Sequence, residues 1–154
     1  MIRSEAEYRE AVKRAREDQE YAAQQRAALI ERGLTPEQVE RAMEPLLSFH
    51  IQLNEEIAWY ERVRRGDFEQ LSRLTSLGQL LIALRIATGL TQRQLAEKLS
   101  VSEAQVSRDE RNEYHGITLD RAQRIVDALG ATLTIGVQQP PTPHDRPALA
   151  SVGS

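Results

Sequence analysis

Hydrophobic residues recur every three or four positions through the first part of the chain, which is the spacing of one face of a helix. Ser4 followed by Glu7 is a capping-box pattern and Gly33 supplies a left-handed stop, so we expect a first long helix over 4–32. Its stripe is only partly apolar, which indicates a weak coiled-coil seam. The stripe consists of Tyr8, Val12, Ala15, Gln19, Ala22, Arg26 and Leu29.

A second long helix is predicted over 35–65, because Thr35 suits the N-cap and Gly66 follows as a stop. Pro45 lies inside this run and predicts a bend around 41–45. With so little chain between them, the two helices should fold back as an antiparallel hairpin. The second stripe consists of Val39, Met43, Leu46, His50, Leu53, Ile57 and Tyr60, widened by Phe49 and Val63.

The pattern changes from Thr75 onward, where apolar residues crowd all sides of shorter predicted helices. This pattern of apolar residues is typical of a compact helical domain. The domain should end near Gly130, after a helix that starts at Thr118. The residues expected inside it are Leu77, Leu80, Leu81, Leu84, Ile86, Leu95, Leu99, Val101, Val106, Leu119, Ala122, Ile125, Val126 and Leu129.

The segment ATLTIGV at 131–137 alternates apolar and β-branched polar residues, the period of a strand. A lone strand has no partner within a helical chain, so we expect it to pair with its copy in a second subunit. Leu133, Ile135 and Val137 would then lie in the dimer contact. The proline-rich residues 138–154 are predicted to be a disordered tail.

The predicted fold class is therefore all-α, with three parts. A long antiparallel hairpin occupies 1–70, and a compact domain that ends in one short dimerising strand occupies 71–137, ahead of the tail at 138–154. The net charge is −3, yet residues 1–70 carry 11 Lys and Arg against 15 Asp and Glu, whereas residues 71–154 carry 9 against 8. The hairpin is thus the acidic part, which favours different partners for the two modules.

Candidate chemistry narrows the class of protein further. The chain has no cysteine, and its three histidines are dispersed, so no catalytic residue, cofactor or metal site is predicted. Glu55, Glu56 and Glu61 read as a solvated face of the hairpin beside arginines rather than as acid–base groups. No apolar run approaches the roughly 18 to 20 residues that cross a bilayer, so we expect a soluble cytoplasmic protein without membrane contact.

The stretch LTQRQLAEKLSVSEAQVSRDE at 90–110 predicts two short helices joined by almost nothing. Thr91 can cap the first, Ser100 and Val101 make the turn, and Ser102 can cap the second. Small and apolar residues would lock the helices together, while the outward face of the second helix stays polar. Two interpretations of this segment are open. Either the free face of the second helix enters a groove of DNA, or the segment is a helical hairpin of a protein that does not bind DNA.

These residues resemble the helix-turn-helix of the Cro/lambda-repressor-like, xenobiotic-response-element type regulators. The resemblance covers about 76–130 and includes a preceding helix with the sequence LGQLLIALRIATG. The matching residues are Gly89, Leu90, Thr91, Gln92, Leu95, Ala96, Val101, Ser102, Val106, Ser107, Arg108 and Glu110.

The resemblance implies a helix that enters the major groove of double-stranded DNA with its N-terminal residues at base edges. Arg108 would donate to guanine O6 and N7, Glu103 would accept from a cytosine amine and Ala104 would touch a thymine methyl group. Ser107 completes the base-reading set. The residues implied to contact phosphates are Thr91, Gln92, Arg93, Ser102 and Arg111.

Two positions depart from the family pattern. The turn position usually held by glycine is Ser100, where a left-handed conformation would cost roughly 1–2 kcal/mol and alter the turn. Asp109 stands where an apolar residue is usual, and the loop after it is longer by about one residue. Either the second helix ends early or Tyr114 and Ile117 fill the gap.

The expected function is a dimeric, sequence-specific transcriptional regulator that represses its own promoter by reading a palindromic operator through 103–110. The 131–137 strand is also similar to that of HipB-type antitoxins, and the helix-turn-helix to that of HigA-type antitoxins. The alternative is therefore an antitoxin of a type II toxin–antitoxin system, whose hairpin or tail holds a toxin. The Trp59 and Tyr60 pair near the hairpin's end is either core or part of such a partner surface.

Overall fold

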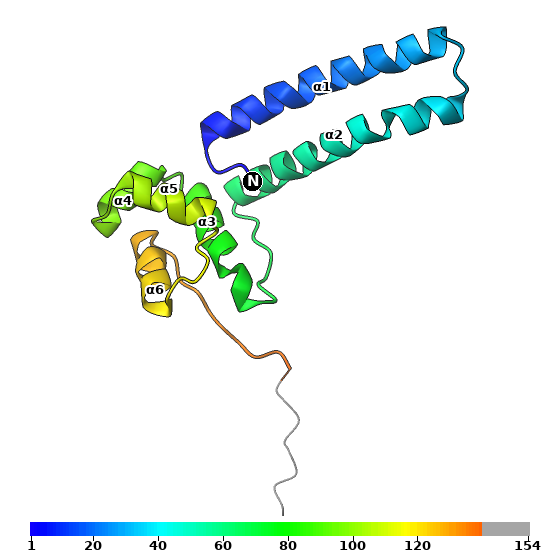
Figure 1. The fold of residues 1–154 in the computed structure, drawn as a ribbon. Coiled ribbons are helices and arrows are strands. Elements are labelled where there is room, and N and C mark those ends of the chain that lie inside the picture. Colours follow the sequence, from blue (N-terminus) through cyan, green and yellow to red (C-terminus); the bar gives the residue numbers. More distant parts are fainter. Residues whose placement is uncertain (140–154) are drawn as a thin grey trace, which may run out of the picture.

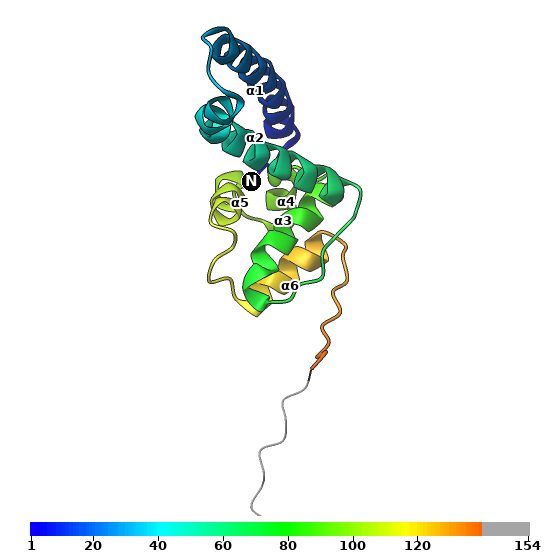
Figure 2. The same ribbon diagram turned by 90° about the vertical axis from the view of Figure 1, so that its right-hand side faces the viewer.

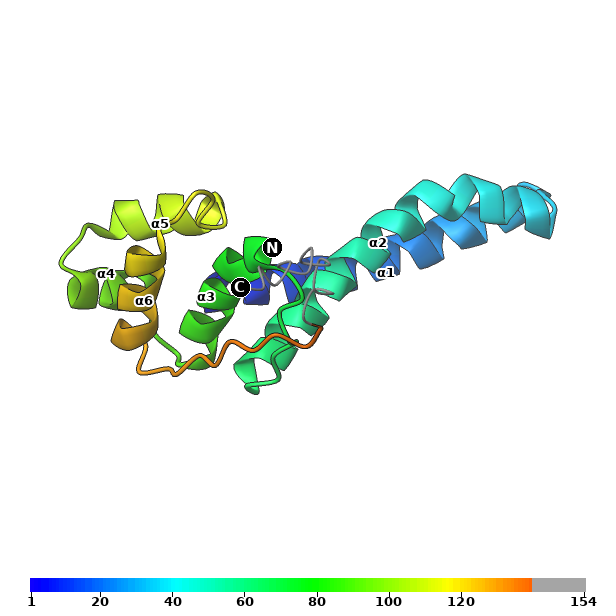
Figure 3. The same ribbon diagram turned by 90° about the horizontal axis from the view of Figure 1, so that it is seen from below.

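The computed structural model describes residues 1–139, and this range is helical, with six α-helices and one 3-10 turn. A long hairpin projects from a compact body of shorter helices (Figure 1). Seen from below, the hairpin extends away from the body and makes the molecule elongated (Figure 3). Within 1–139 no single helix is both long and apolar enough to cross a membrane, and one bent pair, Leu74–Ala87 with Gln92–Leu99, passes that test jointly.

The hairpin consists of α1 (Glu5–Glu31) and α2 (Pro36–Arg64), which run antiparallel as the sequence predicted. Thr35 and Gln38 form a complete capping box at the start of α2. At the start of α1 the box is only half made: the Ser4 hydroxyl accepts from the Glu7 amide, but the Glu7 carboxylate accepts from the Arg3 amide at 2.7 Å.

The interior of the hairpin is thin, because only four of its residues beyond the base are buried: Ala11, Ala15, Val39 and Met43. The prediction that Phe49 widens the buried stripe is wrong, since this side chain is 71% exposed. Pro45 lies inside α2, and the helix continues through it. A hairpin of two helices has one inner seam, so the side chains on its flanks stay in solvent.

Aromatic stacking fixes the base of the hairpin. The rings of Tyr8 and Tyr60 lie 5.0 Å apart and nearly parallel, and the Tyr8 hydroxyl donates to Glu61 at 2.7 Å. The Arg64 guanidinium lies about 6 Å from both rings and pairs with Glu5 at 3.0 Å. Tyr60 is therefore a core residue, as the first of the two interpretations of the aromatic pair held.

The body begins with a 3-10 turn, η1 (Leu74–Ser76), and contains α3 (Leu77–Ala87), α4 (Gln92–Leu99), α5 (Glu103–Arg111) and α6 (Leu119–Ala128). The other helices of the body surround α3 (Figure 2), so its residues 81–86 are all buried. The core of the body confirms most of the predicted set and contains Leu81, Ile82, Leu84, Ile86, Leu95, Ala96, Val106, Ala122, Ile125, Val126 and Leu129.

Two residues predicted to be inside are outside. Val101 is 40% exposed because it belongs to the turn between α4 and α5, where no third element covers it. Leu119 is 76% exposed because it is the first residue of α6, ahead of the turns that pack on the body. Tyr114, by contrast, is buried in the loop after α5, and burial raises the pKa of its phenol.

One hydrophobic cluster joins the two predicted modules across the expected boundary near residue 70. Ile2, Tyr60 and Val63 belong to the same buried cluster as α3 and α6. The end of α2 packs directly on α3. The N-terminus and the base of the hairpin are therefore part of the body's core.

Residues 131–137 form no strand in this single chain, so the strand predicted there is not shown. A strand exists only when a second backbone supplies its ladder, and no other segment in the described part of the chain is extended beside it. Leu133, Ile135 and Val137 are exposed. Of the predicted tail, residues 140–154 lie outside the described range.

Candidate nucleic-acid interface

The helices α4 and α5 form a helix-turn-helix whose inner face is locked. Thr91 caps α4 in a full capping box with Gln94, and the Ser102 hydroxyl accepts from the Gln105 amide at the start of α5. Between the two helices Leu95, Ala96 and Val106 are at most 2% exposed. The small Ala96 lets the helices meet closely, as predicted, so α5 cannot rotate without breaking this contact.

The turn keeps its left-handed residue although that residue is not glycine. Ser100 has φ 57° and ψ 40°, and the amides of Ser100 and Val101 donate to the last carbonyls of α4. The expected change of the turn is therefore not seen. Ser100 adopts the left-handed conformation, which a residue with a Cβ atom adopts at an energetic cost.

We expect Ser100→Gly to raise the free energy of unfolding by about 0.5–1 kcal/mol, because glycine removes a left-handed strain of about 1–2 kcal/mol but gains freedom in the unfolded chain. Ser100→Ala, which keeps the Cβ atom, should leave stability nearly unchanged. Urea unfolding of the three proteins would measure this. A destabilised glycine variant would contradict the strain assigned to the turn.

The outward face of α5 presents the four predicted base-reading residues together. Glu103, Ala104 and Arg108 are exposed and Ser107 is half-buried. The Arg108 guanidinium donates to the Gln105 side-chain oxygen at 3.0 Å, so the arginine is held along the helix in the free protein. All four lie in the first two turns of α5.

A hydrogen-bonded chain behind this face was not predicted. The Gln105 side-chain amide donates to Asp109 at 2.9 Å, and Asp109 in turn pairs with Arg121 of α6. This pairing explains the unusual carboxylate at 109, which replaces an apolar contact by an ion pair between α5 and α6. In the sequence, this chain was indicated by the carboxylate of Asp109 at a position that is usually apolar. Its partner Arg121 lies twelve residues further on, in another helix.

The predicted phosphate-contacting residues surround the turn but differ in how free they are. Arg111 is exposed and has no ion-pair partner among the described residues, whereas Arg93 pairs with Glu97 at 3.3 Å. The hydroxyls of Thr91 and Ser102 cap their helices. Gln92 is half-buried, and its amide donates to Glu110 at 2.7 Å, so its side chain already has an internal partner.

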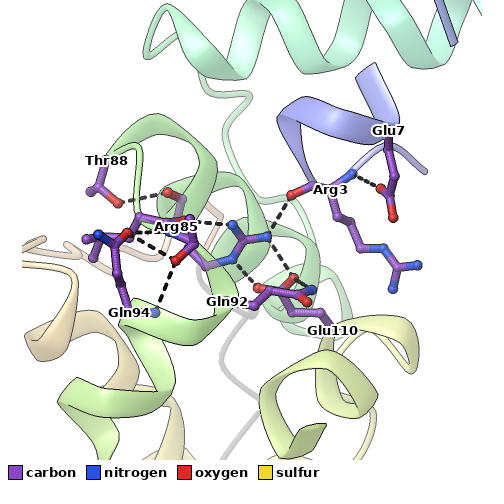
Figure 4. Close-up of polar contacts among 9 residues, drawn as sticks. Arg3, Glu7, Arg85, Thr88, Gln92, Gln94 and Glu110 are labelled. Atoms are coloured by element: carbon purple, nitrogen blue, oxygen red, sulfur yellow. Dashed lines mark hydrogen bonds and ion pairs between the residues drawn. The ribbon is translucent and has the colours of Figure 1, made fainter. Parts of the chain in front are cut away.

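Behind the two helices lies a buried ion pair that sequence reasoning missed. The Arg85 side chain is 4% exposed and the Glu110 side chain is fully covered. Arg85 Nε donates to one carboxylate oxygen of Glu110, and Nη2 donates to the other at 2.8 Å (Figure 4). The signal was a single arginine within the apolar run LLIALRIA of α3, since a charge at such a position needs a buried partner.

Two further N–H groups of Arg85 donate to backbone carbonyls. Nη1 donates to the Leu90 carbonyl and Nη2 to the Arg3 carbonyl, both at 2.8 Å (Figure 4). Through this one side chain α3 holds the end of α5, the start of α4 and the N-terminal segment that leads into the hairpin. The orientation of α5 thus depends on residues far outside the two-helix motif.

Among residues 1–139 no group of three or more histidine, cysteine or carboxylate side chains is arranged to hold a metal ion. His50 and His115 lie on different parts of the molecule, in α2 and in the loop after α5, and His144 falls outside the described range. The arrangement at α4 and α5 offers hydrogen-bond donors and acceptors on an exposed face.

A locked helix pair with a polar outer helix, packed on the buried faces of α3 and α6, defines the class of helix-turn-helix DNA-binding domains. Residues 81–135 match the family model described as Helix-turn-helix, the XRE-type domain, so the chain carries a domain of this type, which indicates a DNA-binding regulator. Comparisons with curated proteins and with solved structures gave no match.

Proposed function

We propose that the protein is a sequence-specific transcriptional regulator that acts as a dimer on double-stranded DNA. The observation that carries this proposal is the exposed face of α5. Val106 and Glu110 are buried and hold the helix in place, while Glu103, Ala104 and Arg108 are exposed to solvent. Such a rigid, outward polar helix is what base readout in the major groove requires.

In this proposal two copies place their α5 helices in successive major grooves of a palindromic operator, about 34 Å apart. Arg108 reads guanine and the residues around the turn contact phosphates. Occupancy of the promoter of its own gene blocks transcription by steric exclusion. DNA binding of this kind would take place in the cytoplasm.

A dimer is also suggested by the weak charge of the body. Residues 71–154 carry only one more basic than acidic residue, so one copy makes few phosphate contacts and two copies double them. We propose that the exposed Leu133, Ile135 and Val137 pair with their copies as a two-stranded ribbon. This would supply the backbone partner that a single chain lacks.

We expect Arg108→Ala to lose about 1–3 kcal/mol of preference for the DNA upstream of the protein's own gene over scrambled duplex, because a bidentate contact to guanine is removed. Arg108 is exposed, so the fold should be unchanged. Fluorescence anisotropy at two salt concentrations would separate this sequence preference from the phosphate attraction, which salt weakens.

The matched control is Arg124→Ala, which removes an exposed arginine from α6, outside the helix-turn-helix. This variant should retain the full preference. Equal binding of the wild-type protein to specific and scrambled duplex would rule out base readout by α5. In that case the acidic hairpin would become the surface on which to look for the function.

A second candidate function is an antitoxin of a type II toxin–antitoxin system, which would also repress its own operon. The favouring observation is the long acidic hairpin, which projects from the body and is larger than DNA binding requires (Figure 1). Co-expression of the full chain with the product of an adjacent gene tests this. Copurification and rescue of growth would support the antitoxin, and a lone gene would favour a plain regulator.

A further inference from the structure

A directed chain of hydrogen bonds runs from α6 to the guanidinium of Arg108. The Arg121 guanidinium donates to one carboxylate oxygen of Asp109, and the Gln105 side-chain amide donates to the other at 2.9 Å. The Arg108 guanidinium in turn donates to the Gln105 oxygen at 3.0 Å. Residues three and four apart lie on one side of a helix, so Gln105 can reach both of its partners on α5. We call these four side chains the Arg108 relay.

The chemistry of its members fixes the direction of the relay. An arginine only donates hydrogen bonds, and an ionised carboxylate only accepts them, whereas a glutamine amide can do either at each end. Because Asp109 accepts on one side of Gln105, the amide must turn its NH2 group toward Asp109. The carbonyl oxygen of Gln105 is then directed to Arg108. The carboxylate at 109 thus decides that Gln105 is an acceptor for Arg108.

An ion pair between α5 and α6 does not by itself account for this arrangement. The Asp109 side chain is 17% exposed, and it uses one oxygen for Arg121 and the other for Gln105. The contact with Arg121 joins two helices. The contact with Gln105 joins two neighbours on the same helix, so it adds nothing to the packing of α5 on α6. What it does determine is the orientation of the Gln105 amide.

Arg108 is held by the relay and still keeps most of its donors free. Its side chain is exposed, and within the described part of the chain its guanidinium donates only to Gln105. The remaining N–H groups are available for the O6 and N7 atoms of a guanine. An arginine that is already held loses less conformational freedom when it binds, so a fixed orientation favours the base that fits it.

We propose that Asp109 and Gln105 are positioning residues for base readout, which hold the Arg108 guanidinium in the orientation that selects guanine. Asp109 acts through Gln105 and does not contact a base. The inference rests on the proposed function, because it assigns what orients the residue that reads the sequence. It adds two determinants of sequence preference that lie behind the exposed face of α5.

Asp109→Asn is the first test, because it replaces one oxygen by an NH2 group and keeps the shape of the side chain. Arg121 then takes the remaining oxygen, and the new NH2 group points to Gln105, whose amide must turn round to accept. The NH2 group of Gln105 now faces Arg108, and two donors repel each other. We expect at least about a fivefold loss of preference for the DNA upstream of the protein's own gene over scrambled duplex, the lower end of what one arginine–guanine contact supplies.

The matched control is Arg121→Ala, which removes the ion pair between α5 and α6 but leaves the Asp109 carboxylate as the acceptor for Gln105. This variant should retain most of the preference. Both substitutions change the net charge, which alters phosphate attraction to the two duplexes alike, so the ratio of the two affinities is the quantity to compare. An equal loss in both variants would overturn the positioning role, since it would show that only the ion pair matters.

Exchanging the two groups gives a rescue that a purely structural role does not predict. In the double variant Gln105→Glu with Asp109→Asn, the amide at 109 accepts from Arg121 and donates to the carboxylate at 105, which accepts from Arg108. The net charge equals that of the wild type. We expect this variant to recover most of the preference that Asp109→Asn loses. In a protein that already carries Arg108→Ala, Asp109→Asn should cause no further loss, because it acts only through Arg108.

The orientation of Arg108 can also be measured without DNA, so that this proposal and base readout fail separately. Nuclear magnetic resonance relaxation of the Arg108 Nε–H group should show a restrained side chain in the wild type and in Arg121→Ala, and a mobile one in Asp109→Asn. Circular dichroism confirms that each variant is folded. Equal mobility in the wild-type and Asp109→Asn proteins would overturn the positioning role.

The binding data distinguish the two failures. A wild-type protein that prefers its own upstream DNA, together with an Asp109→Asn variant that keeps the full preference, would overturn the positioning role alone. A wild-type protein without any preference would overturn base readout by α5, and the positioning role with it.

Discussion

Glu110→Ala is expected to lower the free energy of unfolding by about 3–5 kcal/mol, the usual cost of removing one partner of a buried ion pair. The substitution leaves the Arg85 guanidinium inside the core with two of its four recorded hydrogen bonds gone. It also removes the acceptor of the Gln92 amide. Urea unfolding followed by circular dichroism measures the change.

Two comparisons separate the buried charge from a general effect of substitution. Arg93→Ala removes an arginine whose ion pair with Glu97 is exposed, and it should cost less than about 1 kcal/mol. Replacing both buried partners, as in Arg85→Met with Glu110→Leu, should recover much of the loss, because no unpaired charge remains. If Glu110→Ala cost no more than the exposed control, the central role given to this pair would be wrong.

Gly78→Ala should lower the free energy of unfolding by about 3 kcal/mol, at the upper end of the range for overpacking. A Cβ atom on Gly78 would lie 1.8 Å from the Glu113 carbonyl oxygen and 3.2 Å from the Tyr114 Cβ atom. The loop after α5 must move to admit it. That loop is already constrained, since Glu113 and Tyr114 both have positive φ angles.

Gly136→Ala is the matched control, because an added Cβ atom there meets nothing within 4 Å. It should leave stability within about 0.5 kcal/mol of the wild type. Thermal unfolding of both variants is sufficient, and the near-ultraviolet signal of Tyr114 should change only in the Gly78 variant. A Gly78→Ala protein as stable as the wild type would show that the loop yields at little cost.

The orientation of the proposed DNA reader depends on more than its own motif. Arg85 joins Glu110 of α5, the Leu90 carbonyl before α4 and the Arg3 carbonyl ahead of α1. Ile2, Tyr60 and Val63 extend the core from the hairpin's base into the body. The base of the hairpin and α5 are therefore parts of one packed unit.

Local physics is the part that the sequence determined by itself. Capping residues and glycines predicted where helices begin and end. Thr35 and Thr91 are N-caps, and Gly33 and Gly66 adopt left-handed conformations after the two long helices. The spacing of Leu95, Ala96 and Val106 fixed the helix-turn-helix and identified the outward face of α5. These features depend on neighbours along the chain, so a sequence pattern is enough to predict them.

Long-range partners were decided only by the tertiary structure. Arg85 and Glu110 are 25 residues apart, and Asp109 and Arg121 lie on different helices. The periodicity of the sequence therefore does not predict either pair. The exposure of Phe49 and Leu119, both predicted inside, depended on which neighbouring elements were present to cover them. Helical spacing gives the direction of a side chain, whereas its burial depends on a second surface that comes from elsewhere in the fold.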